Sequence, residues 1–283
     1  MENKQTASQL TFSLDLLPQV AKHIEFLEHV AEVQDLRNEN ILKHAAYRYE
    51  NYWLPLAAEH PNECLAAPVD IEWIWLCHML SPKQYESDCL ALVGTVINHT
   101  FYSGQERQQL LQVSENHWLQ MYGPNEEPFT MEPQSIGNEN TADTTSSLSY
   151  DVVAAALRQE SFYDKISSTE KRNGENQTSS LDRYKQFIYL CKLLPTLFFS
   201  PPIDVDLLWH THQANPQAYK SDMCRILKRL LNHDDTSTSD KEFKEANALT
   251  GAHWEMLYRE PCLAEMGTCG NRCRVMCTRC TVH

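Results

Sequence analysis

Glycine and basic charge are both scarce in this sequence. Only 8 of its 283 residues are glycine, which excludes a collagen-like or glycine-rich low-complexity chain. Lysine and arginine together number 24, against 38 aspartate and glutamate residues, and the net charge is −14. Domains that bind nucleic acid normally carry a basic footprint, so this balance argues against a nucleic-acid partner.

Long apolar runs are also absent. The longest, residues 193–199, is short and is interrupted by Thr196, whereas a membrane-spanning helix needs about 20 apolar residues. The first twelve residues contain no apolar segment of the kind found in secretory signals. Apolar residues still make up 42% of the chain, enough for a core. We therefore expect a soluble protein of the cytoplasm or nucleus with no membrane partner.

An internal repeat is the strongest pattern in the chain. The segment PVDIEWIWLCH at 68–78 corresponds to PIDVDLLWHTH at 202–212, an offset of 134 residues. Offsets of 135 and 136 relate Arg48-Tyr49 to Arg183-Tyr184 and Ser13 to Ser149. The repeat predicts a first helical unit at 13–123 and a second at 149–258. Between them we predict a polar, mobile linker at 124–148, and after them a cysteine-rich tail at 259–283.

Apolar residues recur at helical spacing within each unit. After the Pro-x-Asp start, the first unit places Ile71, Ile74, Trp75 and His78 at i, i+3, i+4 and i+7, and the second unit repeats this face. The sequence predicts an all-α fold of two tandem duplicated helical units. The aromatic residues expected to anchor the core are Trp75, Trp209, Tyr85 and Tyr219.

Helix starts are predicted from capping residues. Asp70 and Asp204 follow the prolines that open the repeated helix, and we expect their carboxylates near the N-cap. Ser81-Pro82 and Asn215-Pro216 predict the start of the next helix in each unit. The first helix of each unit is expected near 15–33 and 150–165.

The second unit carries a resemblance to a known family. RYKQF at 183–187, DVDLLWHTHQ at 204–213, Pro216 and Tyr219 follow one another as in the glycine-rich domain-containing protein family, best known from plants. The resemblance covers about residues 13–258. It implies a domain of unknown function, an association with stress, hormone and developmental responses, and no established catalytic chemistry. Some relatives carry a short RNA-binding-like motif and a glycine-rich tail; this chain ends in cysteines instead, and Leu76 stands where the family has histidine.

Two duplicated histidines lie on the apolar stripe of the repeat. A buried imidazole needs partners for its ring nitrogens. One interpretation of His78 and His212 is structural, with each ring bonded to a carboxylate or a tyrosine of its own unit. The local candidates are Asp88, Asp222, Tyr85 and Tyr219. The alternative is a shared site in which the two histidines converge across a pseudo-two-fold interface.

His210 suggests a different chemistry. On a helix it diverges from His212, but it pairs with Asp206 at i and i+4, a spacing that allows two metal ligands. The first unit has Glu72 and Leu76 at the matching positions. The alternative to a metal is a hydrogen-bonded pair on the polar flank of the helix.

The tail offers a second candidate metal site. Cys269, Cys273, Cys277, Cys280 and His283 could provide a tetrahedral zinc centre, although only Cys277-x2-Cys280 has ordinary zinc-ligand spacing. The alternative is a tail of reactive thiols, since nearby arginines favour thiolates.

Signatures of common enzymes are missing from the sequence. It contains no phosphate-binding loop, no Gly-x-Ser-x-Gly and no His-Glu-x-x-His. We therefore favour a non-catalytic interaction or scaffold protein with protein partners. The alternatives are a metal- or small-ligand-dependent protein that uses the His and Asp positions of the repeats, or an RNA-binding protein.

Overall fold

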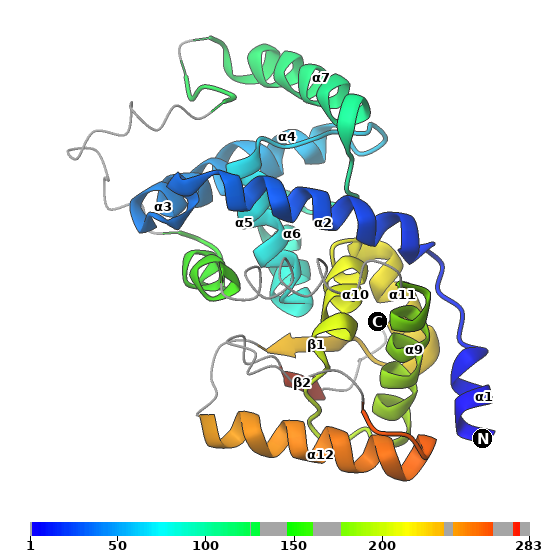
Figure 1. Ribbon diagram of the computed structural model, residues 1–283. Coiled ribbons are helices and arrows are strands. Elements are labelled where there is room, and N and C mark those ends of the chain that lie inside the picture. Colours follow the sequence, from blue (N-terminus) through cyan, green and yellow to red (C-terminus); the bar gives the residue numbers. More distant parts are fainter. Residues whose placement is uncertain are drawn as a thin grey trace.

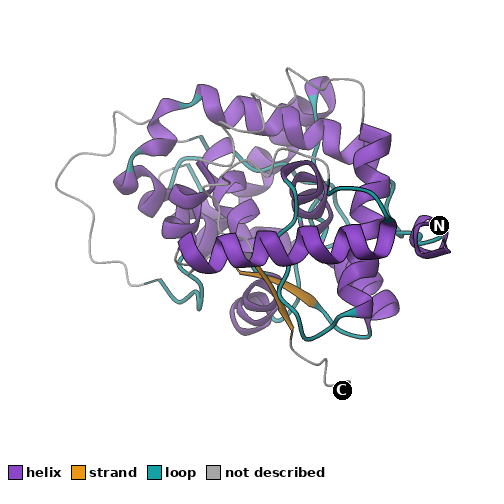
Figure 2. Ribbon diagram, turned by 60° about the horizontal axis from the view of Figure 1, so that its bottom comes forward, coloured by secondary structure: helices purple, strands orange, loops and turns teal. Residues whose placement is uncertain are grey.

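The computed structural model describes residues 2–124, 126–130, 146–160, 177–234, 240–262 and 274–277. The described chain is mostly helical, as Figure 2 shows, and the expected all-α class is confirmed. Two short strands, β1 (Leu231–Asp234) and β2 (Arg274–Cys277), form an antiparallel pair that the sequence did not predict.

The helices of the first half follow the repeat closely. They are α1 (Glu2–Ser8), α2 (Leu16–Glu32), the 3-10 turn η1 (Gln34–Arg37), α3 (Glu39–Arg48), the π-helical turn η2 (Tyr49–Trp53), α4 (Leu54–Glu59), α5 (Val69–Met79), α6 (Pro82–Val93) and α7 (Gly104–Tyr122). The second half contains helical residues 152–160, α9 (Gln177–Leu193), α10 (Ile203–Gln213), α11 (Pro216–Leu227) and α12 (Asp240–Tyr258). Three pairs of repeat helices match in length: α5 and α10 have 11 residues each, α6 and α11 have 12, and α7 and α12 have 19.

Local sequence explains where the repeated helices begin. Ser81 and Asn215 are the N-cap residues of α6 and α11, and a proline follows each, as predicted. Asp70 and Asp204 lie in the first turn, near the N-cap as expected, but Pro68 and Pro202 occupy the N-cap positions and no side chain caps either helix. The two aspartates bind arginines of the preceding helices instead.

One hydrophobic core is shared by both halves. Trp75 is 3% exposed and Trp209 is fully buried, so the predicted tryptophan anchors occupy equivalent buried positions. Tyr85 and Tyr219 are buried beside them. In Figure 1, α7 and α12 lie at opposite ends of the molecule, and α2 crosses between the halves, where it contacts both α5 and α10. The repeat therefore forms a pseudo-two-fold pair around a common centre.

The N-terminal segment of each unit binds the other unit. The backbone N–H of Ser13 donates to Asp222 Oδ2 at 2.7 Å, and the N–H of Ser149 donates to Asp88 Oδ2 at 2.8 Å. Ser13 and Ser149 are themselves equivalent in the repeat. This reciprocal exchange means that a cut at the predicted unit boundary, 124–148, would separate each serine segment from the unit it binds.

Both ends of the predicted linker pack against the first unit. Phe129 is buried, and the Trp118 indole donates to the carbonyl of Glu127 at 2.7 Å. At the other end, the N–H of Ser147 donates to Glu50 Oε1 at 2.8 Å. The remainder of the linker, 131–145, lies outside the described residues.

The cysteine-rich tail is described at residues 259–262 and at β2. Its backbone pairs with β1 in the register Leu231 with Cys277 and Asp234 with Arg274. The other predicted zinc ligands, Cys269, Cys273, Cys280 and His283, lie outside the described residues. The pairing nevertheless places this part of the tail against the second unit.

Candidate functional site

Each unit contains a buried tyrosine–histidine–aspartate cluster. His78 Nδ1 lies 3.0 Å from the Tyr49 hydroxyl, and His78 Nε2 lies 3.2 Å from Asp88 Oδ2. In the second unit the same distances are 3.0 Å from His212 Nδ1 to Tyr184 and 3.3 Å from Nε2 to Asp222 Oδ2. We call these groups the two Tyr–His–Asp clusters.

Burial keeps both histidines neutral. It lowers the pKa of His78 and of His212 below the ordinary value, in spite of the opposing effect of the aspartates. Burial alone would raise the pKa of Asp88, but hydrogen bonds from His78 and Ser149 bring it below its usual range. The arrangement therefore consists of a carboxylate that accepts from Nε2–H and a tyrosine that donates to Nδ1.

Each cluster also receives the exchanged segment of the other unit. Asp88 and Asp222 accept from the backbone of Ser149 and Ser13, so one carboxylate connects a histidine of its own unit to the opposite chain segment. The rings of Tyr150 and His78 stack, with centroids 6.4 Å apart. Each buried aspartate therefore connects the two halves of the molecule through a hydrogen bond.

The tryptophans of the repeat are held by a second duplicated chain of hydrogen bonds. Trp75 Nε1 donates to the Tyr85 hydroxyl at 2.9 Å, and Tyr85 donates to the carbonyl of Ile97 at 2.6 Å. Trp209 and Tyr219 repeat this chain at 2.8 Å and 2.7 Å, with the carbonyl of Leu231 as acceptor. Every polar atom of these four side chains is thus used internally.

Two arginine–aspartate pairs brace the start of the repeated helices. Arg48 binds Asp70, and both side chains are almost fully buried. Arg183 Nε lies 2.9 Å from Asp204 Oδ2 in a more exposed setting. Removing one partner of the buried pair would leave an uncompensated charge, which is costly. The structural role of the two aspartates is therefore to bind these arginines.

The two units differ in the side chains that surround Glu72 and its repeat counterpart, Asp206. In the first unit, Glu72 lies 3.4 Å from His99 Nε2, and its other oxygen lies 2.5 Å from Arg107 Nη1. His99 Nδ1 donates to the carbonyl of Ala214 at 2.7 Å, at the C-terminus of α10. This carboxylate is therefore neutralised by an arginine.

In the second unit, a carboxylate and two histidines meet at the matching place. Asp206 Oδ1 lies 3.4 Å from His210 Nε2, and His210 Nε2 lies 3.0 Å from His233 Nε2. One ligand atom from each residue lies within 4.8 Å of the other two, and all three residues are 2% exposed. We call this group the unit-two triad.

The structure separates the predicted site residues into two sets. His78 and His212 bind the predicted partners Asp88 and Asp222, each in its own unit, but the hydroxyl partners are Tyr49 and Tyr184 rather than Tyr85 and Tyr219. His210 points to a different neighbour from His212, as expected for this spacing.

The position assigned to the Asp206–His210 pair was wrong. The pair is buried rather than on a polar flank, and sequence reasoning missed its third member, His233. The repeated Asn98-His99 and Asn232-His233 dipeptides were the available signal. Spacing along one helix could not reveal this residue, because it enters from β1.

A second, exposed histidine–carboxylate cluster lies on the first unit. Glu63 accepts from His60 Nδ1 and from His117 Nε2, at 2.9 Å each, and these ligand atoms also lie within 4.8 Å of one another. Both hydrogen bonds lower the pKa of Glu63 below its ordinary value. Because Glu63 is 47% exposed, water screens this cluster far more than the unit-two triad.

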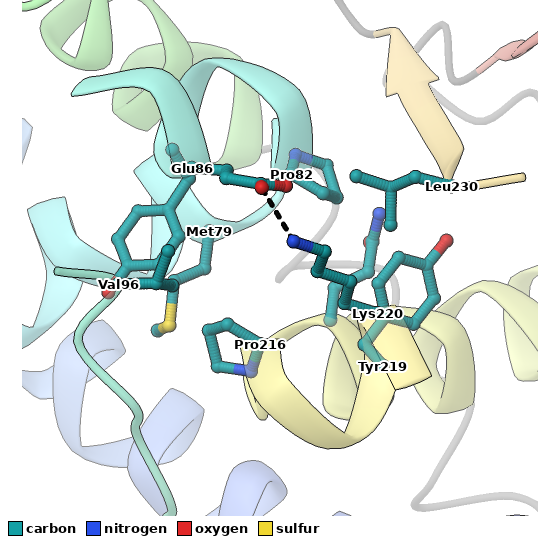
Figure 3. A pocket seen from close by; sticks show the side chains of 10 residues that line it. Met79, Pro82, Glu86, Val96, Pro216, Tyr219, Lys220 and Leu230 are labelled. Carbon is teal, nitrogen blue, oxygen red and sulfur yellow. Dashed lines mark hydrogen bonds and ion pairs between the residues drawn. The ribbon is translucent and has the colours of Figure 1, made fainter. Parts of the chain in front are cut away.

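A small pocket lies where the two units face each other across α6 and α11. Figure 3 shows Pro82 and Glu86 opposite Pro216 and Lys220, with an ion pair of 2.6 Å between Glu86 and Lys220. Its walls are mainly apolar, with repeat-related residues on both sides. None of the four histidine clusters described above contributes its histidines to the walls.

Comparison with known proteins identifies the family of this chain. The family described as Glycine-rich domain-containing protein-like matches residues 1–88 and 84–222 in two consecutive segments. The chain belongs to this family. Glycine-rich domain-containing protein 1 of Arabidopsis thaliana is 33% identical over 266 residues, and glycine-rich domain-containing protein 2 of the same plant is 32% identical over 265 residues.

The family relationship covers most of this chain but only part of the relatives. Each alignment spans 88% of the chain and about a third of the relative, 32% and 33% respectively. No solved structure matches this member of the Glycine-rich domain-containing protein-like family. Among its described residues, no helix is both long enough and apolar enough to cross a membrane.

Proposed function

We propose that this chain is a non-catalytic scaffold that presents its outer helices to protein partners. The observation that carries the proposal is the use of the duplicated histidines. Both ring nitrogens of His78 and of His212 face a tyrosine and an aspartate of the same unit in the core. The polar side chains that the repeat preserves in both units are thus engaged with one another in the core, and their aspartates also bind the other unit.

The reciprocal exchange of serine segments supports the same function. A surface that spans both units keeps its shape only while the units stay in register, and the Ser13–Asp222 and Ser149–Asp88 bonds fix that register. The proposal places the scaffold in the cytoplasm or nucleus. By family resemblance it serves stress or developmental signalling.

The scaffold proposal is tested by two substitutions of His212. His212→Leu removes the hydrogen bond to the Tyr184 hydroxyl and the contact with Asp222, which keeps its bonds from Ser13 and Arg225. Each unsatisfied buried group costs about 1–3 kcal/mol. His212→Gln can keep one of the two interactions and should cost less. Urea unfolding followed by circular dichroism measures both losses, and partner capture is measured at a temperature where all variants are folded.

The scaffold hypothesis predicts that folded His212→Gln captures partners as well as the parent does. The hypothesis is contradicted if His212→Leu retains the parent's stability while a ligand-dependent activity disappears. The matched substitution His78→Leu is the control in the other unit, and it should destabilise the chain by a similar amount.

The cysteine-rich tail is proposed as a zinc site held by Cys269, Cys273, Cys277, Cys280 and His283. Its support is the ligand set, since thiolates and imidazole are the groups that zinc prefers. Replacement of the four cysteines by serine should remove one equivalent of zinc. In the cobalt-substituted protein it should also abolish thiolate-to-cobalt absorption. Unchanged zinc content and absorption after this replacement would contradict the tail site.

A further inference from the structure

We infer that the unit-two triad, Asp206, His210 and His233, binds a divalent transition metal, with zinc the best match. Two imidazoles and one carboxylate are the donors of many zinc sites. This inference goes beyond the scaffold function and uses no residue of the cysteine-rich tail, although His233 lies on β1, which pairs with β2 of the tail. It rests on the geometry of three buried ligand atoms from α10 and β1.

The spacing of these atoms fits tetrahedral coordination. With zinc–ligand distances of about 2.0–2.1 Å, two ligands of a tetrahedral centre lie roughly 3.4 Å apart. The observed separations are 3.0 Å between His210 Nε2 and His233 Nε2 and 3.4 Å between His210 Nε2 and Asp206 Oδ1. Small side-chain adjustments therefore bring three ligands around one ion.

The two imidazoles face each other through their Nε2 atoms, which lie 3.0 Å apart. In the metal-free chain, one ring donates its Nε2–H to the other. On binding, that ring moves its proton to Nδ1, and both Nε2 lone pairs face the ion.

The unit-two triad differs from the matching residues of the first unit. In the first unit, Glu72 is neutralised by Arg107, and Leu76 occupies the position of His210. The second unit thus has an imidazole where the first unit has a leucine.

The test uses the full-length chain with Cys269, Cys273, Cys277 and Cys280 replaced by serine, so that the predicted tail ligands cannot contribute thiolates. After metal removal, zinc is titrated in competition with a chromophoric chelator, and cobalt(II) reports the ligand type. We expect one equivalent to bind. We also expect cobalt spectra of a tetrahedral nitrogen and oxygen site without thiolate-to-cobalt absorption.

The decisive variant is His210→Leu, which installs the residue that the first unit has at this position. It should weaken zinc binding by about 100-fold or more. Asp206→Asn and His233→Gln are near-isosteric second variants for which the same loss is expected. Circular dichroism of each metal-free variant confirms that the loss is not unfolding.

Two controls separate this site from other histidines. His60→Ala breaks the exposed cluster with Glu63 and His117 and should leave the high-affinity equivalent intact. Zinc should raise the melting temperature of the parent that carries the four serine replacements but not that of His210→Leu in the same background. The inference is overturned if the parent binds no zinc, if its melting temperature ignores zinc, or if His60→Ala rather than His210→Leu removes the bound ion.

Discussion

Truncation of Trp209 to alanine is expected to destabilise the protein by roughly 3–5 kcal/mol. The indole is fully buried, contacts the rings of Phe187 and His233, and donates to the Tyr219 hydroxyl. The loss combines a cavity with the loss of one hydrogen bond, while the Tyr219 hydroxyl still donates to the carbonyl of Leu231. Because whole domains are stable by only about 5–15 kcal/mol, this change should be obvious in urea unfolding.

Two further substitutions divide that loss into its parts. Trp209→Phe keeps most of the packing and removes only the Nε1 hydrogen bond, so it should cost less than alanine does. Trp75→Ala, the equivalent change in the first unit, should match Trp209→Ala. If Trp209→Ala melts like the parent, Trp209 is not the core anchor described here.

Acidification from pH 7 to pH 5 is expected to remove about 2 kcal/mol of stability through His23 alone. Burial, followed by the nearby His99, lowers the pKa of His23 to about 3. The Thr211 hydroxyl donates to the carbonyl of Leu207, so it accepts from His23 Nδ1–H at 2.8 Å. This leaves His23 Nε2 as a bare nitrogen with no hydrogen-bond partner among the described residues.

The sign follows from proton binding. Below about pH 6.5 the unfolded chain takes up a proton at His23, whereas the folded chain does so only near the depressed pKa of about 3. Stability is therefore present above pH 6.5 and falls as the pH decreases towards 3. His78, which faces Tyr49, Asp88 and Glu50, has a lowered pKa and acts in the same direction.

Urea unfolding at several pH values, in the presence of a chelator, measures this effect. His23→Gln should flatten the profile between pH 7 and pH 5 by about 2 kcal/mol, because glutamine has no proton to take up. The exposed His29 is the control, and His29→Gln should follow the parent curve. Identical profiles for His23→Gln and the parent would show that His23 is not held neutral by burial.

The sequence predicted the helices well because their signals are local. Period-3.6 apolar stripes placed α5 and α10, and Ser81-Pro82 and Asn215-Pro216 placed the starts of the next helices. The first helix of the first unit was expected at 15–33 and runs from Leu16 to Glu32. Such features depend on neighbours within one or two helical turns, and these are visible in the chain itself.

The roles of individual polar residues were harder to predict. The Asp70 carboxylate had two physically sensible uses, the amides of its own helix or a distant cation, and Arg48 was 22 residues away. Tyr49 follows Arg48 in a dipeptide that the repeat preserves, but nothing in the sequence indicated that its hydroxyl would face His78. Choosing between partners of comparable chemistry requires the packing of whole helices.

By itself, the sequence determined the helical class, the duplication and the buried aromatic anchors, because repetition and periodicity are properties of the chain. Only the tertiary structure decided that Ser13 binds Asp222 while Ser149 binds Asp88, and that His233 joins Asp206 and His210. These contacts join residues far apart in the sequence, and two similar units could have paired within themselves or with each other. The physical reason is that their shared core buries both units together, which brings the polar groups of each within hydrogen-bond distance of the other.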